Sequence, residues 1–322
     1  MKFGDFEYSV INPEYLFTSE GRISFDIYSL REIKGVKQPV LLVSKDTYTS
    51  EIRKILAERR HGKIYIQKQA SRDYEMFLER SIGELIGDKK VSVQKKSKLI
   101  YSCASTVMAD VFTDPRSGEN IARTKTMTNN VINFILSNQQ SIVHLLNMGS
   151  HDYYTFTHCV NVAVFGVGLW NVINKGGSAQ ELHEFAFGCM MHDVGKSKIH
   201  DNILKKPGRL TKEEFDVIKS HPVSGYDLMY DIAPQVSLDV ILHHHEKCSG
   251  DGYPDGLKDG EISDNAKISA IADVYDALTT NRPYSDARRP YNAIMMMKEQ
   301  MVGHFEQDKF IKFIQFLGGR NN

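Results

Sequence analysis

Residues 243–254 read HHHEKCSGDGYP, so three consecutive histidines precede a glutamate and a loop with glycines at 250 and 252. The mostly apolar residues that run from Pro234 to these histidines predict a helix whose last turn carries them. Two consecutive histidines at a helix end can reach one metal ion if the helix unwinds there, and glycines permit the turn that must follow. The stretch therefore predicts a metal site where a helix ends in a tight loop.

An adjacent histidine and aspartate form a second candidate site. His192 and Asp193 lie in MMHDVGKSKI, at the end of an apolar run. Adjacent residues cannot share one helical face, but at a helix end the backbone can turn both side chains inward. An imidazole and a carboxylate together suit first-row divalent metals. Because a carboxylate has two oxygens, Asp193 can also bridge two ions.

Three further residues are candidate ligands. His158 lies in YTFTHCVNVAVF and His221 lies in KSHPVSG. A histidine on an apolar helix is more often a hydrogen-bonded core residue than a ligand, so His158 alone is a weak signal. Asp273 lies in an otherwise apolar helix predicted for residues 265–281, where an unpaired carboxylate is costly. Asp276, three residues later, competes with Asp273 for the same role.

The composition is that of an ordinary globular protein. The chain has 322 residues, of which 41% are apolar and 25% are charged, and it is long enough for two domains. Lysine plus arginine equals aspartate plus glutamate, at 40 each, so no bulk positive field points to duplex nucleic acid or an anionic membrane.

Several signals bear on the compartment. The first ten residues, MKFGDFEYSV, lack the basic and apolar regions of a signal peptide. The apolar run 160–173 is shorter than a bilayer span and contains two asparagines, which predicts a buried helix. The four cysteines, at 103, 159, 189 and 248, are scattered and predict reduced thiols. We therefore expect a cytoplasmic protein with no membrane insertion.

The sequence pattern divides the chain into three predicted parts. Residues 1–70 mix strand-like runs with a helical segment, which predicts a small mixed α/β domain. Residues 71–147 are helical and predict a connector, a common place for the contacts of a homodimer. Residues 148–322 are predicted to form an all-helical domain. The fold class is therefore mainly α.

Local signals define elements within these parts. The strand-like runs are 22–30, 38–44 and 63–67, and the helical runs before residue 150 are 48–60, 73–86, 92–112 and 126–146. Ser178 and Thr211 each begin a capping-box pattern, with Glu181 and Glu214 three residues later. Pro222 suits the first turn of a new helix.

Taken in order, the candidate ligands give the pattern H…HD…H…HH…D, and here the chain resembles a known family. The motifs that carry the resemblance are TH (157–158), HDVGK (192–196), LKKPGRLTKEEF (204–215), KSHPVSG (219–225), HHEKCSGDGYP (244–254), IADVYDALTTNRPY (271–284) and HFEQDKF (304–310). They closely resemble the HD-GYP domain, a subclass of the HD phosphohydrolase superfamily that hydrolyses cyclic dinucleotides, chiefly cyclic di-GMP, in bacteria. The resemblance covers about residues 150–318.

The resemblance implies a ligand set. One metal would be held by His158, His192 and Asp273, and the other by His221, His244 and His245, with Asp193 bridging the two. His243 would then have no ligand role. The implied cofactors are two divalent transition-metal ions, iron or manganese first and nickel or zinc as alternatives.

The resemblance also implies the reaction. A hydroxide between the two metals would cleave cyclic di-GMP to linear pGpG, to GMP or to both, with no covalent nucleophile. Lys196 would be catalytic, meeting a phosphate oxygen, Tyr253 would lie beside the substrate phosphates, and Arg282 would contact a phosphate. The cysteines would be bystanders.

This sequence departs from the family pattern at three positions. Ser249 replaces the aspartate of HHExxDGxGYP, and Ser285 stands where a basic residue commonly follows RPY. Arg288 and Arg289 are candidate substitutes for that base. Members with a third metal carry a glutamate four residues before the first histidine ligand, where this chain has Tyr154. The resemblance therefore implies two metals.

Two alternatives remain open at this point. The chain could hydrolyse cyclic GMP–AMP or another phosphodiester, or it could bind a cyclic dinucleotide or a signalling protein without cleaving anything. Every implied ligand and Tyr253 are present, which favours catalysis. The N-terminal region lacks the features of a phosphorylated receiver domain, so it could serve regulation, dimerisation or passive support.

Overall fold

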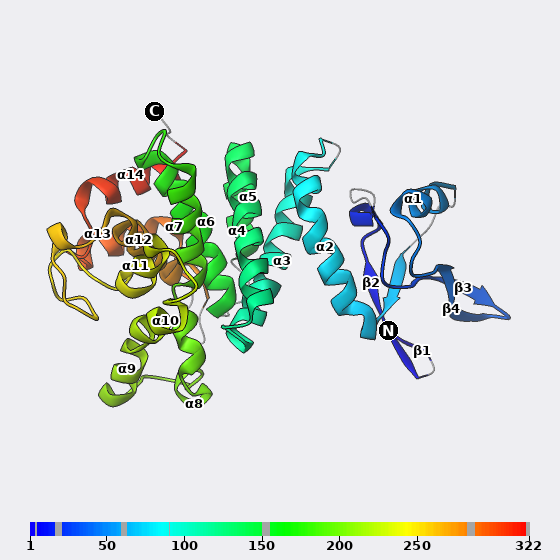
Figure 1. The fold of residues 1–322 in the computed structure, drawn as a ribbon, viewed down its shortest axis with the longest axis horizontal. Helices are drawn as coiled ribbons and strands as arrows, with labels where there is room; N and C mark the ends of the chain where they lie inside the picture. The colour runs from blue at the N-terminus through cyan, green and yellow to red at the C-terminus, as the bar shows by residue number, and fades with distance from the viewer. Residues whose placement is uncertain are drawn as a thin grey trace. The chain divides into compact units, whose positions relative to one another are not determined.

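The computed structural model describes residues 1–3, 5–16, 21–58, 63–89, 91–149, 155–281 and 287–319. The chain separates into two compact units, Met1–Leu99 and Ile100–Asn322, whose elements are labelled in Figure 1. The first unit contains an antiparallel sheet and the second is helical throughout its described residues. The predicted fold class, mainly α with a small α/β part at the N-terminus, is confirmed.

The N-terminal sheet has five strands. They are β1 (Lys2–Phe3), β2 (Phe6–Ile11), β3 (Ile27–Ile33), β4 (Val36–Val43) and β5 (Ile64–Gln67), in the spatial order β1-β2-β5-β3-β4. All described pairs are antiparallel. Ile27 of β3 and Ile64 of β5 are fully buried and pack with Ile52 of helix α1 (Thr49–Glu58) in one apolar core. The predicted strands and helix of this part are confirmed, whereas β1 and β2 were not predicted.

The helices between the sheet and residue 150 differ from the prediction in two respects, because α4 begins at Gly118, eight residues before the predicted start, and one predicted helix is divided in two. They are α2 (Ser71–Gly87), α3 (Val93–Thr113), α4 (Gly118–Ser137) and α5 (Gln139–Gly149), and short 3-10 turns lie at Pro13–Leu16 and Lys68–Ala70. The run 126–146 was predicted as one helix but is two. Asn138 between them has an extended backbone, and its side chain accepts a hydrogen bond from the Gln140 amide, so the chain restarts there.

The helical unit is built around α6 (Thr155–Ile173). Among the described residues, this is the one helix whose length and composition would allow it to cross a membrane. In the structure, however, 78% of its most apolar 18-residue stretch is buried inside the protein. Buried side chains lie on every side of it, which is typical of a core helix. The expectation that residues 160–173 form a buried helix is confirmed.

The remaining helices of this unit follow α6 in the chain. They are α7 (Ala179–Met191), α8 (Asp201–Leu204), α9 (Lys212–Lys219), α10 (His221–Met229), α11 (Gln235–His243), α12 (Asp264–Thr279), α13 (Pro290–Gln300) and α14 (Gln307–Leu317), with 3-10 helices at Val194–Lys198 and Asp259–Glu261. Helices α7, α12 and α14 all pack against α6. The packing of α12 against α6 places Asp273 beside His158.

The predicted helix starts agree with the structure. The Thr211 hydroxyl and the Glu214 carboxylate form both bonds of a capping box at α9. The Ser178 hydroxyl accepts a hydrogen bond from the Glu181 amide at the start of α7. Pro222 lies in the first turn of α10, and Pro234 caps α11.

Candidate metal centre

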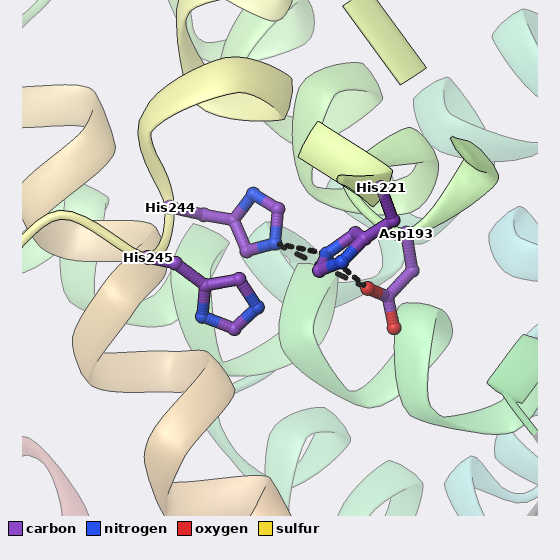
Figure 2. A group of neighbouring side chains, drawn as sticks. All are labelled: Asp193, His221, His244 and His245. Carbon is purple, nitrogen blue, oxygen red and sulfur yellow. Dashed lines mark hydrogen bonds and ion pairs between the residues drawn. The ribbon is translucent and has the colours of Figure 1, made fainter. Parts of the chain in front are cut away.

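Five segments of the helical unit bring the predicted ligands together. His158 comes from α6, His192 and Asp193 follow α7, His221 begins α10, His244 and His245 follow α11, and Asp273 comes from α12. Their ligand atoms form two groups, and the atoms of each group lie within 4.8 Å of one another. One group is His158, His192 and Asp273. The other, drawn in Figure 2, is Asp193, His221, His244 and His245.

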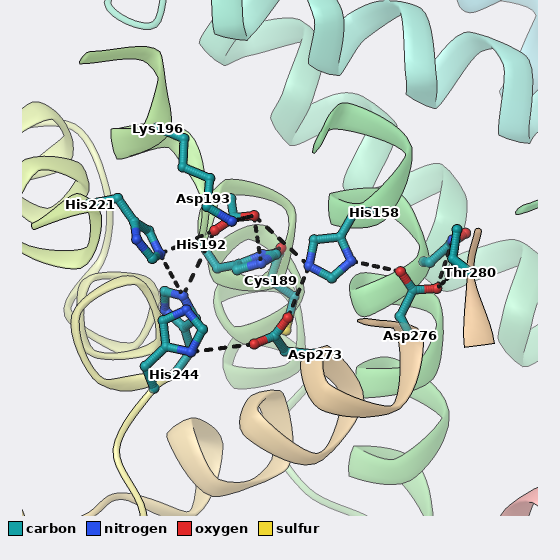
Figure 3. A network of polar contacts seen from close by, with 12 residues as sticks. His158, Cys189, His192, Asp193, Lys196, His221, His244, Asp273, Asp276 and Thr280 are labelled. Carbon is teal, nitrogen blue, oxygen red and sulfur yellow. Dashed lines mark hydrogen bonds and ion pairs between the residues drawn. The ribbon is translucent and has the colours of Figure 1, made fainter. Parts of the chain in front are cut away.

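Asp193 faces both groups with different oxygens (Figure 3). Its Oδ1 lies 3.2 Å from His221 Nε2 and 4.0 Å from His244 Nε2. Its Oδ2 lies 3.5 Å from His192 Nε2 and 3.9 Å from His158 Nε2. The side chain is 1% exposed, so it is shielded from bulk solvent. This is the placement that a carboxylate needs to bridge two cations.

Backbone carbonyls orient three of the histidines. His192, His221 and His244 each donate Nδ1–H to the carbonyl three residues earlier, over 2.8, 2.7 and 2.9 Å respectively. A neutral imidazole has one N–H, so this bond leaves the Nε2 lone pair of each ring available. All three Nε2 atoms point into the cluster. The chain thus fixes the tautomer that a metal ligand requires.

A second carboxylate orients His158. Its Nδ1 lies 2.6 Å from Asp276 Oδ2 and its Nε2 lies 2.9 Å from Asp273 Oδ1. Asp276 is held in turn by the Asn161 amide at 2.9 Å and the Thr280 hydroxyl at 3.0 Å. The structure therefore places Asp273 inside the ligand group and Asp276 behind it, where it supports the histidine ring.

The cluster has the electrostatics of a cation site. His221 Nε2 and His244 Nε2 face each other across 3.2 Å, and His192 Nε2 is buried with no hydrogen-bond partner. Facing lone pairs repel, and a buried unpaired nitrogen costs free energy, unless a cation lies between them. Burial lowers the pKa of His244 well below its ordinary value and lowers that of His245 to about 3. Both rings are therefore neutral at pH 7.

The two carboxylates of the cluster stay ionised. Burial alone would raise the pKa of Asp193, but its interactions with Lys196 and His192 outweigh it and lower the pKa well below its ordinary value. Burial would also raise the pKa of Asp273, but the hydrogen bond with His158 has the larger effect and lowers this pKa well below its ordinary value. Neutral imidazoles combined with carboxylates are a donor set for first-row divalent metals.

The loop after the histidines is organised by Glu246. This buried carboxylate accepts hydrogen bonds from the amides of Asp255, Gly256 and Leu257, at 2.7, 3.0 and 3.0 Å. Gly250 has a φ of +86°, a left-handed conformation that favours glycine, as the sharp turn predicted. No role was predicted for Glu246, although a carboxylate before a glycine-rich loop can accept hydrogen bonds from free loop amides.

His243 points away from the ligand groups. Its Nδ1 lies 2.8 Å from Asp239 Oδ1 and its Nε2 lies 3.1 Å from Asp255 Oδ2. The ring thus joins α11 to the loop through two carboxylates. This geometry agrees with the expectation that His243 is not a ligand.

Two of the three predicted substrate contacts, Tyr253 and Lys196, lie within the described residues. The Tyr253 ring lies 4.7 Å from the His245 ring, between centroids, and burial together with Asp273 and Asp193 raises the pKa of Tyr253. Lys196 Nζ lies 2.6 Å from Asp193 Oδ2. Both residues therefore border the cluster, as expected.

Three of the other predicted positions lie outside the described residues, namely Arg282, Ser285 and Tyr154. The expectations attached to them stay predictions. Arg288 and Arg289 are exposed just before α13. The Ser249 hydroxyl donates to Asp251.

Two cysteines lie close to the cluster. Cys159 Sγ groups with ligand atoms of His192 and Asp193, and Cys189 supplies the carbonyl that orients His192. Burial raises the pKa of both thiols, so both are protonated at pH 7. A protonated thiol is a poor nucleophile. The bystander role of the cysteines stays a prediction.

Comparison with known families supports this geometry. Residues 175–308 match the family model described as HD domain. The chain carries an HD domain. The resemblance to HD-GYP proteins that the motifs predicted is confirmed. A solved structure of an HDG"Y"P protein from Bdellovibrio bacteriovorus matches with a TM-score of 0.69, covers 97% of this chain and 100% of that one, and is 21% identical. At that identity the likeness shows the fold.

Curated relatives match the HD domain and the residues around it. A cyclic di-GMP phosphodiesterase from Pseudomonas aeruginosa is 33% identical over 229 residues, which are 70% of this chain and 54% of the relative. A 3'3'-cGAMP-specific phosphodiesterase from Vibrio cholerae is 30% identical over 194 residues, 58% of this chain and 36% of the relative. The matches thus span about half of these relatives or less.

Proposed function

We propose that this HD-domain protein hydrolyses the phosphodiester bonds of a bacterial cyclic dinucleotide, cyclic di-GMP first, with the help of two divalent metal ions. The observation that carries the proposal is Asp193, whose two oxygens face two separate groups of ligand atoms. The names of the curated relatives support the substrate class. Because one of those relatives is specific for 3'3'-cGAMP, that dinucleotide is the second candidate substrate.

The residues present fit two transition-metal ions. His158, His192 and Asp273 would hold one ion, and His221, His244 and His245 would hold the other, with Asp193 shared between them. The unpaired His192 Nε2 and the facing lone pairs of His221 and His244 are what such ions would satisfy. Iron and manganese are proposed first, with nickel and zinc as alternatives. When bound, the ions would activate a water molecule and neutralise charge on the phosphate.

The chain's own residues complete the site. Lys196 has three N–H donors, so it can keep its contact with Asp193 and also donate to a phosphate oxygen. Glu246 fixes the loop that carries Tyr253 next to His245. The Asp276 carboxylate holds His158 in one orientation. Groups held in this way by fixed contacts supply the preorganisation that stabilises a developing charge.

The roles of the other parts are also proposals. We propose that the sheet-containing N-terminal part, residues 1–70, regulates the HD domain, and that the helical part, 71–147, contributes to a homodimer or binds signalling partners. Residues 148–322 are proposed to contain the catalytic machinery, acting in the cytoplasm.

Metal and product analysis tests the main proposal. The protein purified without oxygen is expected to hold about two ions per chain and to convert cyclic di-GMP to pGpG, GMP or both. Elemental analysis and chromatography of the products measure this, with 3'3'-cGAMP assayed in parallel. Tight binding of either dinucleotide by the metal-loaded protein without any turnover would instead support a non-catalytic binding protein.

Asp276→Asn is expected to weaken the His158 metal site. An asparagine can present its N–H₂ group to His158 Nδ1, so the ring loses its preference for the tautomer with a free Nε2. Loss of such a supporting carboxylate typically costs about 10- to 100-fold in metal affinity or activity. Titration of the apoprotein with Mn²⁺ measures the change. Thr280→Val, which removes another contact of the same carboxylate, serves as the control and should have a smaller effect.

A further inference from the structure

Helix α9 presents a lysine between two aromatic rings beside the metal centre. Lys219 Nζ lies 5.1 Å from the centre of the Phe215 ring and 5.8 Å from the centre of the Tyr253 ring. Tyr253 in turn lies 4.7 Å from the His245 ring. A continuous row of side chains therefore runs outward from the ligand group through Tyr253 to Lys219 and Phe215.

The two α9 residues are accessible and only loosely engaged. Phe215 is 45% exposed, although it is a large apolar side chain. The Lys219 side chain is 41% exposed, and its ion pair with Asp216 is long, at 3.9 Å. Lys196, by contrast, is held against Asp193 at 2.6 Å. Lys219 is thus a cation that can take a new anionic partner at little cost.

Helix α9 is itself firmly placed. Its N-terminus has the complete capping box of Thr211 and Glu214, and both oxygens of Glu214 also bind Lys206 Nζ, at 2.7 and 2.6 Å. The helix ends at Lys219, two residues before His221 of the ligand group. Phe215 and Lys219 are four residues apart and so share one face of the helix. The capped helix thus holds the pair beside Tyr253.

A cyclic dinucleotide carries groups that Lys219 and Phe215 can bind. Such a molecule has two phosphates and two bases, and only one phosphate can occupy the metals at a time. We propose that Lys219 binds the second phosphate and that Phe215 stacks against a base, so that α9 forms the half of the substrate site distant from the metals. This inference rests on the proposed function. A lysine acts on phosphate as a point charge, and aromatic rings accept any base.

Steady-state kinetics of the full-length, metal-loaded protein test this assignment. With cyclic di-GMP, Lys219→Met is expected to raise KM about tenfold and Phe215→Ala about fivefold, because each removes one substrate contact. The kcat should change less than threefold and the metal content should not change. Lys219→Arg should restore most of the affinity. Lys212→Met, an exposed lysine on the same helix, is the matched control and should behave as wild type.

A second substrate separates this inference from the proposed function. Bis(4-nitrophenyl) phosphate has a single phosphate, so Lys219→Met should hydrolyse it at the wild-type rate. Wild-type turnover of cyclic di-GMP with an unchanged KM in both α9 variants would overturn the α9 assignment and leave the proposed function standing. An equal rise of KM for both substrates would also overturn it. Turnover of bis(4-nitrophenyl) phosphate without binding or cleavage of either cyclic dinucleotide would overturn both.

Discussion

Asp193→Ala is expected to lower kcat for cyclic di-GMP about a thousandfold or more and to reduce bound metal to one ion or fewer per chain. The reason is geometric, because the two oxygens of this one carboxylate face the two ligand groups. Its loss removes a ligand from both groups at once and leaves Lys196 without its 2.6 Å partner. Initial rates and elemental analysis of the same preparation measure both effects.

Asp201→Ala is a suitable control for this variant. It removes an exposed carboxylate from α8 whose ion pair with Lys205 is largely in solvent, so rate and metal content should stay at wild-type values. Circular dichroism should show that Asp193→Ala keeps its helices, since the carboxylate lies at a helix end and not within the apolar core. Wild-type turnover by Asp193→Ala with two bound ions would exclude Asp193 as the bridge.

The sequence was sufficient to predict which residues meet at the centre, because the ligands occur in short motifs whose order matches a family. It also predicted the helix starts, where capping depends on a few neighbouring residues such as Thr211 and Glu214. The turn at Gly250 could be predicted for the same reason, because a left-handed backbone depends on the local sequence. Local chemistry and ordered motifs are what a single sequence carries most directly.

Other features depend on contacts between distant segments. Asp273 and Asp276 lie three residues apart on one face of α12, so sequence alone left both as candidates. The packing of α12 against α6 decides between them, because the His158 ring contacts one carboxylate on each side, Asp273 at Nε2 and Asp276 at Nδ1. Strand β2 was missed for a related reason. Its burial does not alternate regularly, and its partner β5 lies more than fifty residues later in the sequence.

Gly195→Ala is expected to disrupt the centre almost as severely as loss of the bridge, although Gly195 has no side chain. A Cβ at this position would lie 2.0 Å from the His221 carbonyl oxygen and 2.5 Å from the Gly225 amide nitrogen. Both atoms belong to the backbone of α10, so no side chain can turn aside to make room. The 3-10 segment after Asp193 and helix α10 must therefore separate, and His221 moves away from Asp193 Oδ1.

The expected result is a loss of about 100-fold in kcat/KM, release of one metal ion, and a free energy of unfolding lowered by about 2 kcal/mol, with Tm falling by about 6 °C. Kinetics, elemental analysis and thermal unfolding measure these quantities. Gly260→Ala is the matched control, because a Cβ there meets no atom within 4 Å. If Gly195→Ala kept both ions and the wild-type Tm, the close approach of the HD segment to α10 would not be what holds His221 in the site. The glycine of the HDVGK motif would then have a role other than packing. In the structure it allows the close approach to α10 that places His221 in its ligand group.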